Sequence, residues 1–357
     1  MPDDPGQRWL HLFTSNIREL YISDAIDLLA APEGVHYRFR YEAKYISDEA
    51  RVLWERADHL QRRQVMVHFS LQHPANFHPA VFMPLRQGEV VRTLFEGNTY
   101  VVYFRLSRYL PLADRPQYSA SDRAQAVQRY SAALRDLLPN ATPDHAVHAT
   151  TGASPEPLVA PTDSAGRDFE TLVRFVTPSL PAHQRTYFRV ASIETKSGKQ
   201  VKPDQSGVMP LIAGTEYTLN LAHYHYEPLA EPATISVVAP DSLSVVGDRD
   251  ILIRSRYDVI PIRLFPPFRE NSVSDELAIK TVAPAFGPTV RLPLVVNPAT
   301  SVALFGPALG FGAASAIALP PILASGQNTV LRIAFAVLGA AAVGLGLWWR
   351  RSRGLGS

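Results

Sequence analysis

An uncharged stretch near the end of the chain constrains its architecture most. No charged side chain occurs from residue 292 to residue 331. Within and just after this stretch, two apolar blocks, 301–324 and 330–349, are separated by a short polar segment at 325–329. A helix needs about 20 apolar residues to cross a hydrocarbon core of about 30 Å. The spacing therefore predicts a C-terminal transmembrane helical hairpin, which makes the protein a two-span protein of the cell membrane with the lipid bilayer as its first partner.

The charges that flank this hairpin predict its orientation. The tail, 350–357, is basic, whereas the loop between the two blocks carries no Lys or Arg. Positive residues favour the cytoplasmic side of a membrane, and two spans return the chain to its starting side. The apolar cluster at 9–13 is too short for the core of a signal peptide. Both arguments predict that the N-terminal domains and the basic tail face the cytoplasm.

Small residues recur at four-residue spacing in both predicted spans. They are Gly306 and Gly310 in the first span and Ala336, Ala340 and Gly344 in the second. Such spacing lets helices approach closely in lipid. The simpler interpretation is that the two helices pack on each other, and the alternative is self-association of several hairpins, up to a multimeric pore. The spans contain no Asp, Glu or His, which argues against a proton relay or a transporter.

The chain before the hairpin begins with a predicted α+β unit over residues 1–139. Apolar residues recur at helical spacing over 17–29 and 50–60, and aromatic residues alternate with charged ones over 35–45, as in a half-buried strand. Further strands and a last helix are expected at 65–71, 80–85, 89–94, 100–106 and 121–138. The turn residues Gly97 and Asn98 predict a hairpin between the last two strands. We expect a small β-meander or barrel-like sheet with helices, acting as a sensor or binding domain.

A linker and a second unit are predicted to follow. Residues 140–167 are rich in Ala, Thr, Pro, Ser and Asp without periodicity, which is typical of a flexible linker. Residues 168–298 contain many short apolar runs separated by turn residues, which predicts an all-β sandwich of two sheets. The run 211–221 resembles the turn and strand of many immunoglobulin-like modules. The Cys…Trp…Cys pattern of antibody domains is absent, so the resemblance concerns the immunoglobulin-like architecture alone.

The composition excludes several kinds of site. The chain has no cysteine, so disulfides, thiolate catalysis and cysteine-based zinc sites are ruled out. The formal net charge of +2 gives no strong nucleic-acid signal. Phosphate-binding, dinucleotide-binding, hydrolase, kinase and zinc-protease motifs are all missing. We therefore predict no cofactor and no catalytic residue, and we expect binding rather than catalysis.

The best candidate for a ligand surface is a cationic face on the strand at 35–45. Arg38, Arg40 and Lys44 share one side of that strand, and Tyr37 and Tyr41 alternate with them. Arg86 is predicted to add a further cation from the same unit. Cations beside aromatic rings can hold a phosphate-bearing ligand. The alternative is an ordinary solvated face, because several acidic residues of this unit dilute the charge.

Four histidines are weak candidates for metal ligands. His73 and His78 flank a short loop, and His223 and His225 share one face of a predicted strand. Two histidines on one strand face can bind zinc, but no nearby carboxylate completes either pair. A structural loop and an exposed polar sheet face are the simpler interpretations, so we predict no metal.

Three hypotheses for function follow. The first is a membrane-anchored, cytoplasm-facing, non-enzymatic binding or signalling protein that recognises a cytosolic ligand or protein. The second is a pore-type effector of a bacterial defence or stress system, triggered when its cytosolic domains cluster. The third is a membrane-tethered enzyme that uses the His/Arg-rich first unit, and it requires His68, His73 and His78 to converge in a cleft with a carboxylate.

Overall fold

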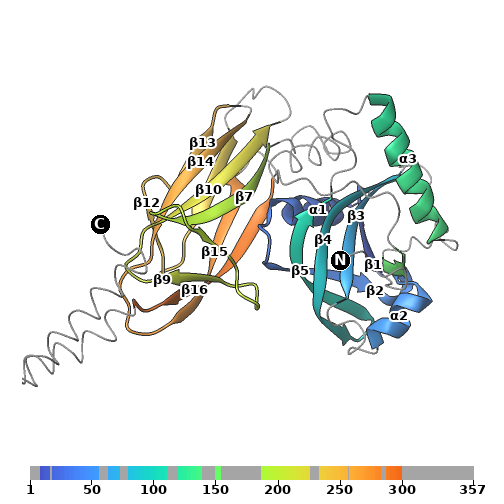
Figure 1. The fold of residues 1–357 in the computed structure, drawn as a ribbon, viewed down its shortest axis with the longest axis horizontal. Coiled ribbons are helices and arrows are strands. Elements are labelled where there is room, and N and C mark those ends of the chain that lie inside the picture. The colour runs from blue at the N-terminus through green and yellow to red at the C-terminus, as the bar shows by residue number, and fades with distance from the viewer. Residues whose placement is uncertain are drawn as a thin grey trace, which may run out of the picture.

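The computed structural model describes residues 9–16, 18–55, 63–72, 79–110, 120–138, 149–153, 186–225, 233–255, 257–282 and 287–299. Within these residues the protein is mostly β, with three sheets and three short α-helices (Figure 1). The first sheet and the helices form one unit, and the other two sheets form a second unit beside it (Figure 1).

The first unit is built on a curled six-stranded sheet with the order β2-β5-β4-β3-β1-β6. Its strands are β1 (Trp9–Ser15), β2 (His36–Glu42), β3 (Gln64–Gln72), β4 (Pro79–Glu96), β5 (Thr99–Tyr109) and β6 (Ala149–Gly152). The pairing of β1 with β3 is parallel, and the other pairings are antiparallel. The predicted hairpin is confirmed, with Gly97 at φ 62° in the turn between β4 and β5. The two strands expected at 80–85 and 89–94 are one long strand, because its bulges bend it without ending it.

Two strands of this sheet, β1 and β6, were not predicted from the sequence. All seven residues of β1 are buried, so β1 lacks the apolar–polar alternation of a half-exposed strand. The strand β6 lies inside the predicted linker, where its backbone pairs with β1. Backbone pairing at a sheet edge needs no periodic side-chain pattern, which explains why composition alone indicated a linker there.

Three α-helices accompany this sheet, α1 (Glu19–Ala30), α2 (Asp48–Glu55) and α3 (Ala120–Asp136). Of the apolar residues whose spacing predicted α1, Ala25, Leu28 and Leu29 are buried. Leu20, which shares that spacing, is 62% exposed. In α2 the predicted apolar residues Ala50 and Trp54 are buried.

The second unit consists of two five-stranded sheets, with the orders β12-β14-β10-β7-β8 and β13-β11-β15-β16-β9. The strands are β7 (Thr186–Thr195), β8 (Gln200–Val201), β9 (Met209–Ile212), β10 (Tyr217–His225), β11 (Ala233–Val238), β12 (Ser244–Val246), β13 (Asp250–Ile253), β14 (Tyr257–Phe265), β15 (Val273–Val282) and β16 (Thr289–Asn297). Burial alternates along β11 and β16 in one sheet and over residues 217–221 of β10 in the other, so each sheet has an apolar face that contributes to the core.

The two units contact each other through α1 and the turn after it. The backbone N–H of Thr289 donates to the Asp27 carboxylate across the junction, at 2.8 Å. A Cβ on Gly34 would lie 3.0 Å from Pro203, and a Cβ on Gly207 would lie 2.8 Å from the His36 backbone nitrogen. Both glycines have φ near 80° or above, which other residues rarely adopt. The close approach of the units therefore depends on glycine at two points.

In the part of the chain that the structure describes, no helix has the length and apolar character required to cross a membrane. The predicted spans at 301–324 and 330–349 lie outside the described residues, as do the tail and the small residues proposed for helix packing.

Candidate functional site

A cleft of about 630 Å³ lies between the two units. The first unit lines it with the turn at 32–34 and with the end of β5, and the second unit lines it with β7 and with residues 200–204. Ligand sites commonly form between domains and commonly occupy about 300–1,000 Å³. The cleft is therefore our candidate binding site.

The wall contributed by the first unit is shaped where α1 ends and β5 continues. Pro32 comes two residues after the end of α1, directly after the C-cap Ala31, and a proline there prevents the helix from continuing. Gly34 then donates to the Leu106 carbonyl at 2.8 Å, and Leu106 donates to the Val35 carbonyl at 2.9 Å. These two bonds hold the turn against β5.

Both walls contain an irregularity in strand pairing. Between β4 and β5 the register shifts from the pair Arg86–Tyr109 to the pair Gly88–Leu106, so Ser107 and Arg108 oppose one residue. Between β7 and β10 the register shifts at Ala191, which has no partner of its own in the ladder. All three extra residues line the cleft. β-bulges redirect side chains and occur often beside functional sites.

Positive charge dominates the described lining. Arg105, Arg108, Arg189 and Lys202 are basic, and Glu33 and Asp204 are acidic. Asp204 accepts hydrogen bonds from the Ser206 backbone and hydroxyl and from the Val208 backbone, and these bonds hold the pKa of its carboxyl below its usual value. All three bonds go to one oxygen, Oδ1, which therefore faces its own turn.

A further cation, Arg86, lies directly behind the wall. It is fully buried, and its guanidinium donates to the carbonyls of Leu28, Ala31 and Ser107. The guanidinium also stacks over the Tyr109 ring, 4.2 Å from the ring centroid. Burial lowers the pKa of Arg86, but arginine remains protonated in proteins. Ser107 and Tyr109 line the cleft, so this charge lies just beneath its surface.

Arg86, predicted to add a further cation from the same unit, lies apart from the exposed cationic face. Arg38 and Arg40 are exposed on β2, whereas Arg86 on β4 is fully buried. Arg86 therefore cannot contact a ligand directly on the face of Arg38 and Arg40.

The tyrosines of the same predicted surface also face inward. Tyr37 donates to the Asp24 carbonyl at 3.2 Å, and Tyr41 donates to the Phe13 carbonyl at 3.4 Å. Lys44 pairs with Glu42 at 2.8 Å and lies over the Tyr45 ring. Neither tyrosine can offer its ring to a ligand held by the exposed arginines, so the proposed stacking arrangement does not form.

Of the four weak candidates for metal ligands, only the side chain of His223 belongs to the described residues. His223 is buried, and its Nε2 lies 3.1 Å from the Ser255 carbonyl oxygen; burial lowers its pKa. His73 and His78 and the side chain of His225 lie outside what the structure describes. Among the described residues, no group of three or more His, Asp or Glu side chains could hold a metal ion.

A buried polar chain links β1, β3 and α3. His11 Nδ1 lies 3.0 Å from His68 Nε2, and Tyr130 Oη lies 2.9 Å from His68 Nδ1. His11 Nε2 lies 3.2 Å from the Ala153 carbonyl oxygen. One arrangement of protons satisfies all three contacts: Tyr130 donates to His68, His68 donates to His11, and His11 donates to Ala153.

Burial keeps this chain neutral. It lowers the pKa of His11 to about 4 and the pKa of His68 well below its ordinary value. The partners are 57 and 62 residues apart in sequence, so no local motif could have revealed them. His68 is thus hydrogen-bonded to His11 and Tyr130 in the interior and does not lie at the cleft.

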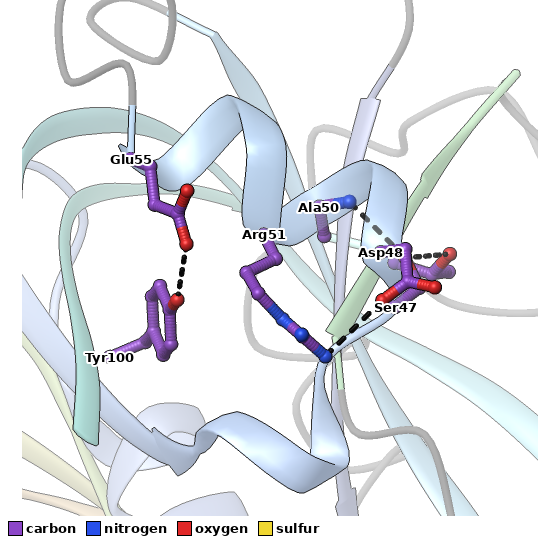
Figure 2. Close-up of polar contacts among 7 residues, drawn as sticks. Ser47, Asp48, Ala50, Arg51, Glu55 and Tyr100 are labelled. Atoms are coloured by element: carbon purple, nitrogen blue, oxygen red, sulfur yellow. Dashed lines mark hydrogen bonds and ion pairs between the residues drawn. The ribbon is translucent and has the colours of Figure 1, made fainter. Parts of the chain in front are cut away.

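A second polar cluster, around α2, organises the helix itself (Figure 2). Ser47 Oγ accepts from the Ala50 backbone at 3.2 Å, which caps the helix. Asp48 and Arg51 form an ion pair at 3.3 Å, and Tyr100 donates to Glu55 at 2.9 Å. We interpret these contacts as structural, because each satisfies a group of α2 or fixes α2 to β5.

Comparisons with known proteins add no identification. No protein-family model matches the sequence, and no curated protein is similar to it in sequence. A solved structure titled "Structure of Vibrio cholerae VesB protease" aligns with 59% of this chain and 77% of its own, at 6% identity and a TM-score of 0.17. At that score the alignment indicates neither a shared fold nor a shared activity.

Proposed function

We propose that the protein is a non-enzymatic binding and signalling protein whose ligand occupies the cleft between its two units. The observation that carries the proposal is the pair of β-bulges, at Ser107 and Arg108 in one unit and at Ala191 in the other, which line the same cleft. A ligand held between them contacts both units at once. Its binding energy then favours one relative placement of the units, which is how a binding event becomes a signal.

The remaining parts of the architecture are assigned within this proposal. The second unit is an immunoglobulin-like sandwich that serves as a spacer or oligomerisation module, and its two five-stranded sheets with alternating burial support that assignment. The hairpin at 301–349 anchors the protein in the cell membrane with both units on the cytoplasmic side. The uncharged stretch and the basic tail support this topology.

The binding step is tested by filling the cleft. Ala191→Trp places a large ring in the wall, and Val238→Trp places the same ring on an exposed position of β11 outside the cleft. The full-length protein, kept in solution with a neutral detergent, is screened against a chemically diverse set of small molecules by ligand-observed NMR. We expect compounds that bind the parent and the Val238→Trp variant but not the Ala191→Trp variant. If no bound compound is lost on filling the cleft, the proposal fails.

The signalling step is tested by distance measurement. Because the chain has no cysteine, single cysteines introduced at the exposed residues Phe95 and Val246 can carry spin labels, one on each unit. We expect the distance distribution between the labels to narrow or shift when a cleft ligand binds. An unchanged distribution at saturating ligand would remove the signalling part of the proposal and leave the binding part intact.

A further inference from the structure

The charges around the cleft point to the chemical class of its ligand, and this inference rests on the proposed function of the cleft. We infer that the cleft binds a small molecule with at least two anionic groups, phosphate or carboxylate. Cations from both units carry the inference, with Arg108 on β5 and Lys202 beyond β8 on the opposite wall.

The two cations are available to a ligand. Arg108 Nε donates to the Gln87 side-chain oxygen at 2.8 Å, which fixes the direction of the guanidinium through a neutral acceptor. Among the described residues, neither Arg108 nor Lys202 has a carboxylate partner. A preoriented arginine fork suits the planar geometry of a carboxylate or the face of a phosphate.

The buried charge of Arg86 strengthens the case independently of the lining residues. Its described hydrogen-bond acceptors are all neutral carbonyl oxygens, so no described carboxylate at hydrogen-bond distance cancels its charge. Glu33, on the exposed turn that lines the cleft, acts on Arg86 only through the electrostatic field. A charge in a poorly polarisable interior is weakly screened, so its field reaches the cleft through the Ser107 and Tyr109 wall and favours an anion there.

The acidic groups of the cleft are outnumbered by its cations. Asp204 stays ionised, with its Oδ1 accepting three hydrogen bonds within its own turn. Arg105 pairs with Glu89 at 3.3 Å, so that pair is close to neutral. The described lining then holds three further basic side chains, Arg108, Arg189 and Lys202, against the two acidic ones, Glu33 and Asp204. The buried Arg86 adds another positive charge behind the wall, so the potential in the cleft is positive.

The test uses the full-length protein and three soluble probes: inorganic triphosphate, citrate and adenosine. Isothermal titration in neutral detergent should show binding of triphosphate or citrate that weakens as salt is raised, and no comparable binding of neutral adenosine. Arg108→Gln and Lys202→Gln should each weaken anion binding by about tenfold, the usual order for a charge-assisted contact. The matched controls Arg38→Gln and Lys199→Gln, exposed positions outside the cleft, should leave binding unchanged.

A further arm distinguishes the source of the anion. Vesicles of phosphatidylcholine with and without phosphatidylserine are offered to the same variants. Binding to the anionic vesicles that is lost in Lys202→Gln and is displaced by triphosphate assigns the site to a lipid headgroup. Binding of the soluble anions without vesicle binding assigns it to a free molecule. Equal binding of adenosine, or equal losses in the control variants, overturns the anion assignment.

The failure of this inference differs from the failure of the proposed function. Suppose that neutral compounds bind the parent but not the Ala191→Trp variant, and that no anion binds. The assignment of an anionic ligand would then be wrong, and the cleft would remain the proposed binding site. The absence of any compound sensitive to Ala191→Trp would remove both.

Discussion

Three carbonyl oxygens, from Leu28, Ala31 and Ser107, surround the buried guanidinium of Arg86. They belong to the last turn of α1, the residue after it and the end of β5. Arg86 therefore joins three segments that meet only in the folded chain. Its burial also shows that an arginine predicted from the sequence to bind a ligand can instead bond to carbonyl groups in the interior.

Replacing Arg86 with methionine should destabilise the first unit by about 3 kcal/mol, because buried acceptors would be left without donors. Urea unfolding followed by tryptophan fluorescence can measure this, since Trp9 and Trp54 are buried in that unit. The exposed Arg38→Met variant should change stability by less than about 0.5 kcal/mol. Similar stabilities for the two variants would show that the carbonyls do not depend on Arg86.

The neutral hydrogen-bonded chain of His11, His68 and Tyr130 predicts that the folded protein loses stability in acid. His11 has a folded pKa of about 4, below its ordinary value of about 6.5 in an unfolded chain. Between those pH values the unfolded state binds more protons than the folded state. The contribution of neutral His11 to the free energy of unfolding is therefore complete above about pH 6.5 and declines as the pH falls toward 4. The slope for one such group is about 1.4 kcal/mol per pH unit.

The variant His11→Gln removes this titration while keeping a side chain that can donate and accept. It should be less stable than the parent at pH 7, and the difference should shrink as the pH is lowered from 6.5 to 4.5. Urea unfolding at several pH values measures the difference. A gap that stays constant with pH would contradict the assignment of neutral His11.

At the scale of elements, α2 shows how a short helix is held in place. Eight residues form a marginal helix in isolation, and here both ends are fixed to the sheet. Ser47 Oγ caps the first turn and also accepts from the Thr150 hydroxyl of β6 at 3.1 Å, while Glu55 in the last turn accepts from Tyr100 of β5 (Figure 2).

Removing the cap should therefore cost about 1 kcal/mol in the variant Ser47→Ala. The variant Ser47→Thr keeps a hydroxyl acceptor and should retain most of the stability. Urea unfolding of the two variants side by side measures the effect. An equal loss in both would indicate that packing around Ser47, rather than its hydrogen bonds, is responsible.

Across the whole molecule, two half-buried carboxyls of α1 have the opposite pH behaviour, Asp27 at the junction between the units and Asp24 three residues before it. Burial raises the pKa of Asp27 to about 7 and the pKa of Asp24 to about 6, from an ordinary value of 3.8. Between 3.8 and 7 the folded state binds more protons than the unfolded state. The contribution of these protonated carboxyls to the free energy of unfolding is complete below about pH 4 and is lost as the pH rises through 7. The histidine and carboxyl contributions partly cancel between pH 4 and 6.5.

The variant Asp27→Asn should make the free energy of unfolding depend less on pH. Its amide oxygen can still accept from the Thr289 backbone, and it cannot ionise. We expect stability close to that of the parent at pH 5 and greater than that of the parent at pH 8, measured by urea unfolding. The exposed control Asp258→Asn should follow the parent at both pH values. A variant that is less stable than the parent at pH 8 would show that the ionised carboxylate supports the junction.

Local patterns account for the elements that the sequence predicted well. The alternation along β2, the turn at Gly97 and the apolar stripe of α2 each depend on neighbours within a few residues, so periodicity and turn chemistry predict them. The strand β1 was missed because a fully buried strand has no alternation, and β6 was missed because it pairs only through its backbone. Among the candidate ligand residues, Arg38 and Arg40 are exposed on β2, whereas Arg86 is buried, because its contacts with Leu28, Ala31 and Ser107 come from segments distant in sequence.

The sequence by itself predicted an α+β unit followed by an all-β unit, excluded cysteine chemistry, and contained an uncharged C-terminal stretch that predicts a membrane hairpin. The tertiary structure decided where a ligand could bind. The cleft depends on bulges in two strands about 80 residues apart, on a buried arginine beneath one wall and on two glycines that allow the units to approach. Each of these is a contact between distant segments, and such contacts leave no periodic mark in the sequence because they are specified by packing rather than by local conformation.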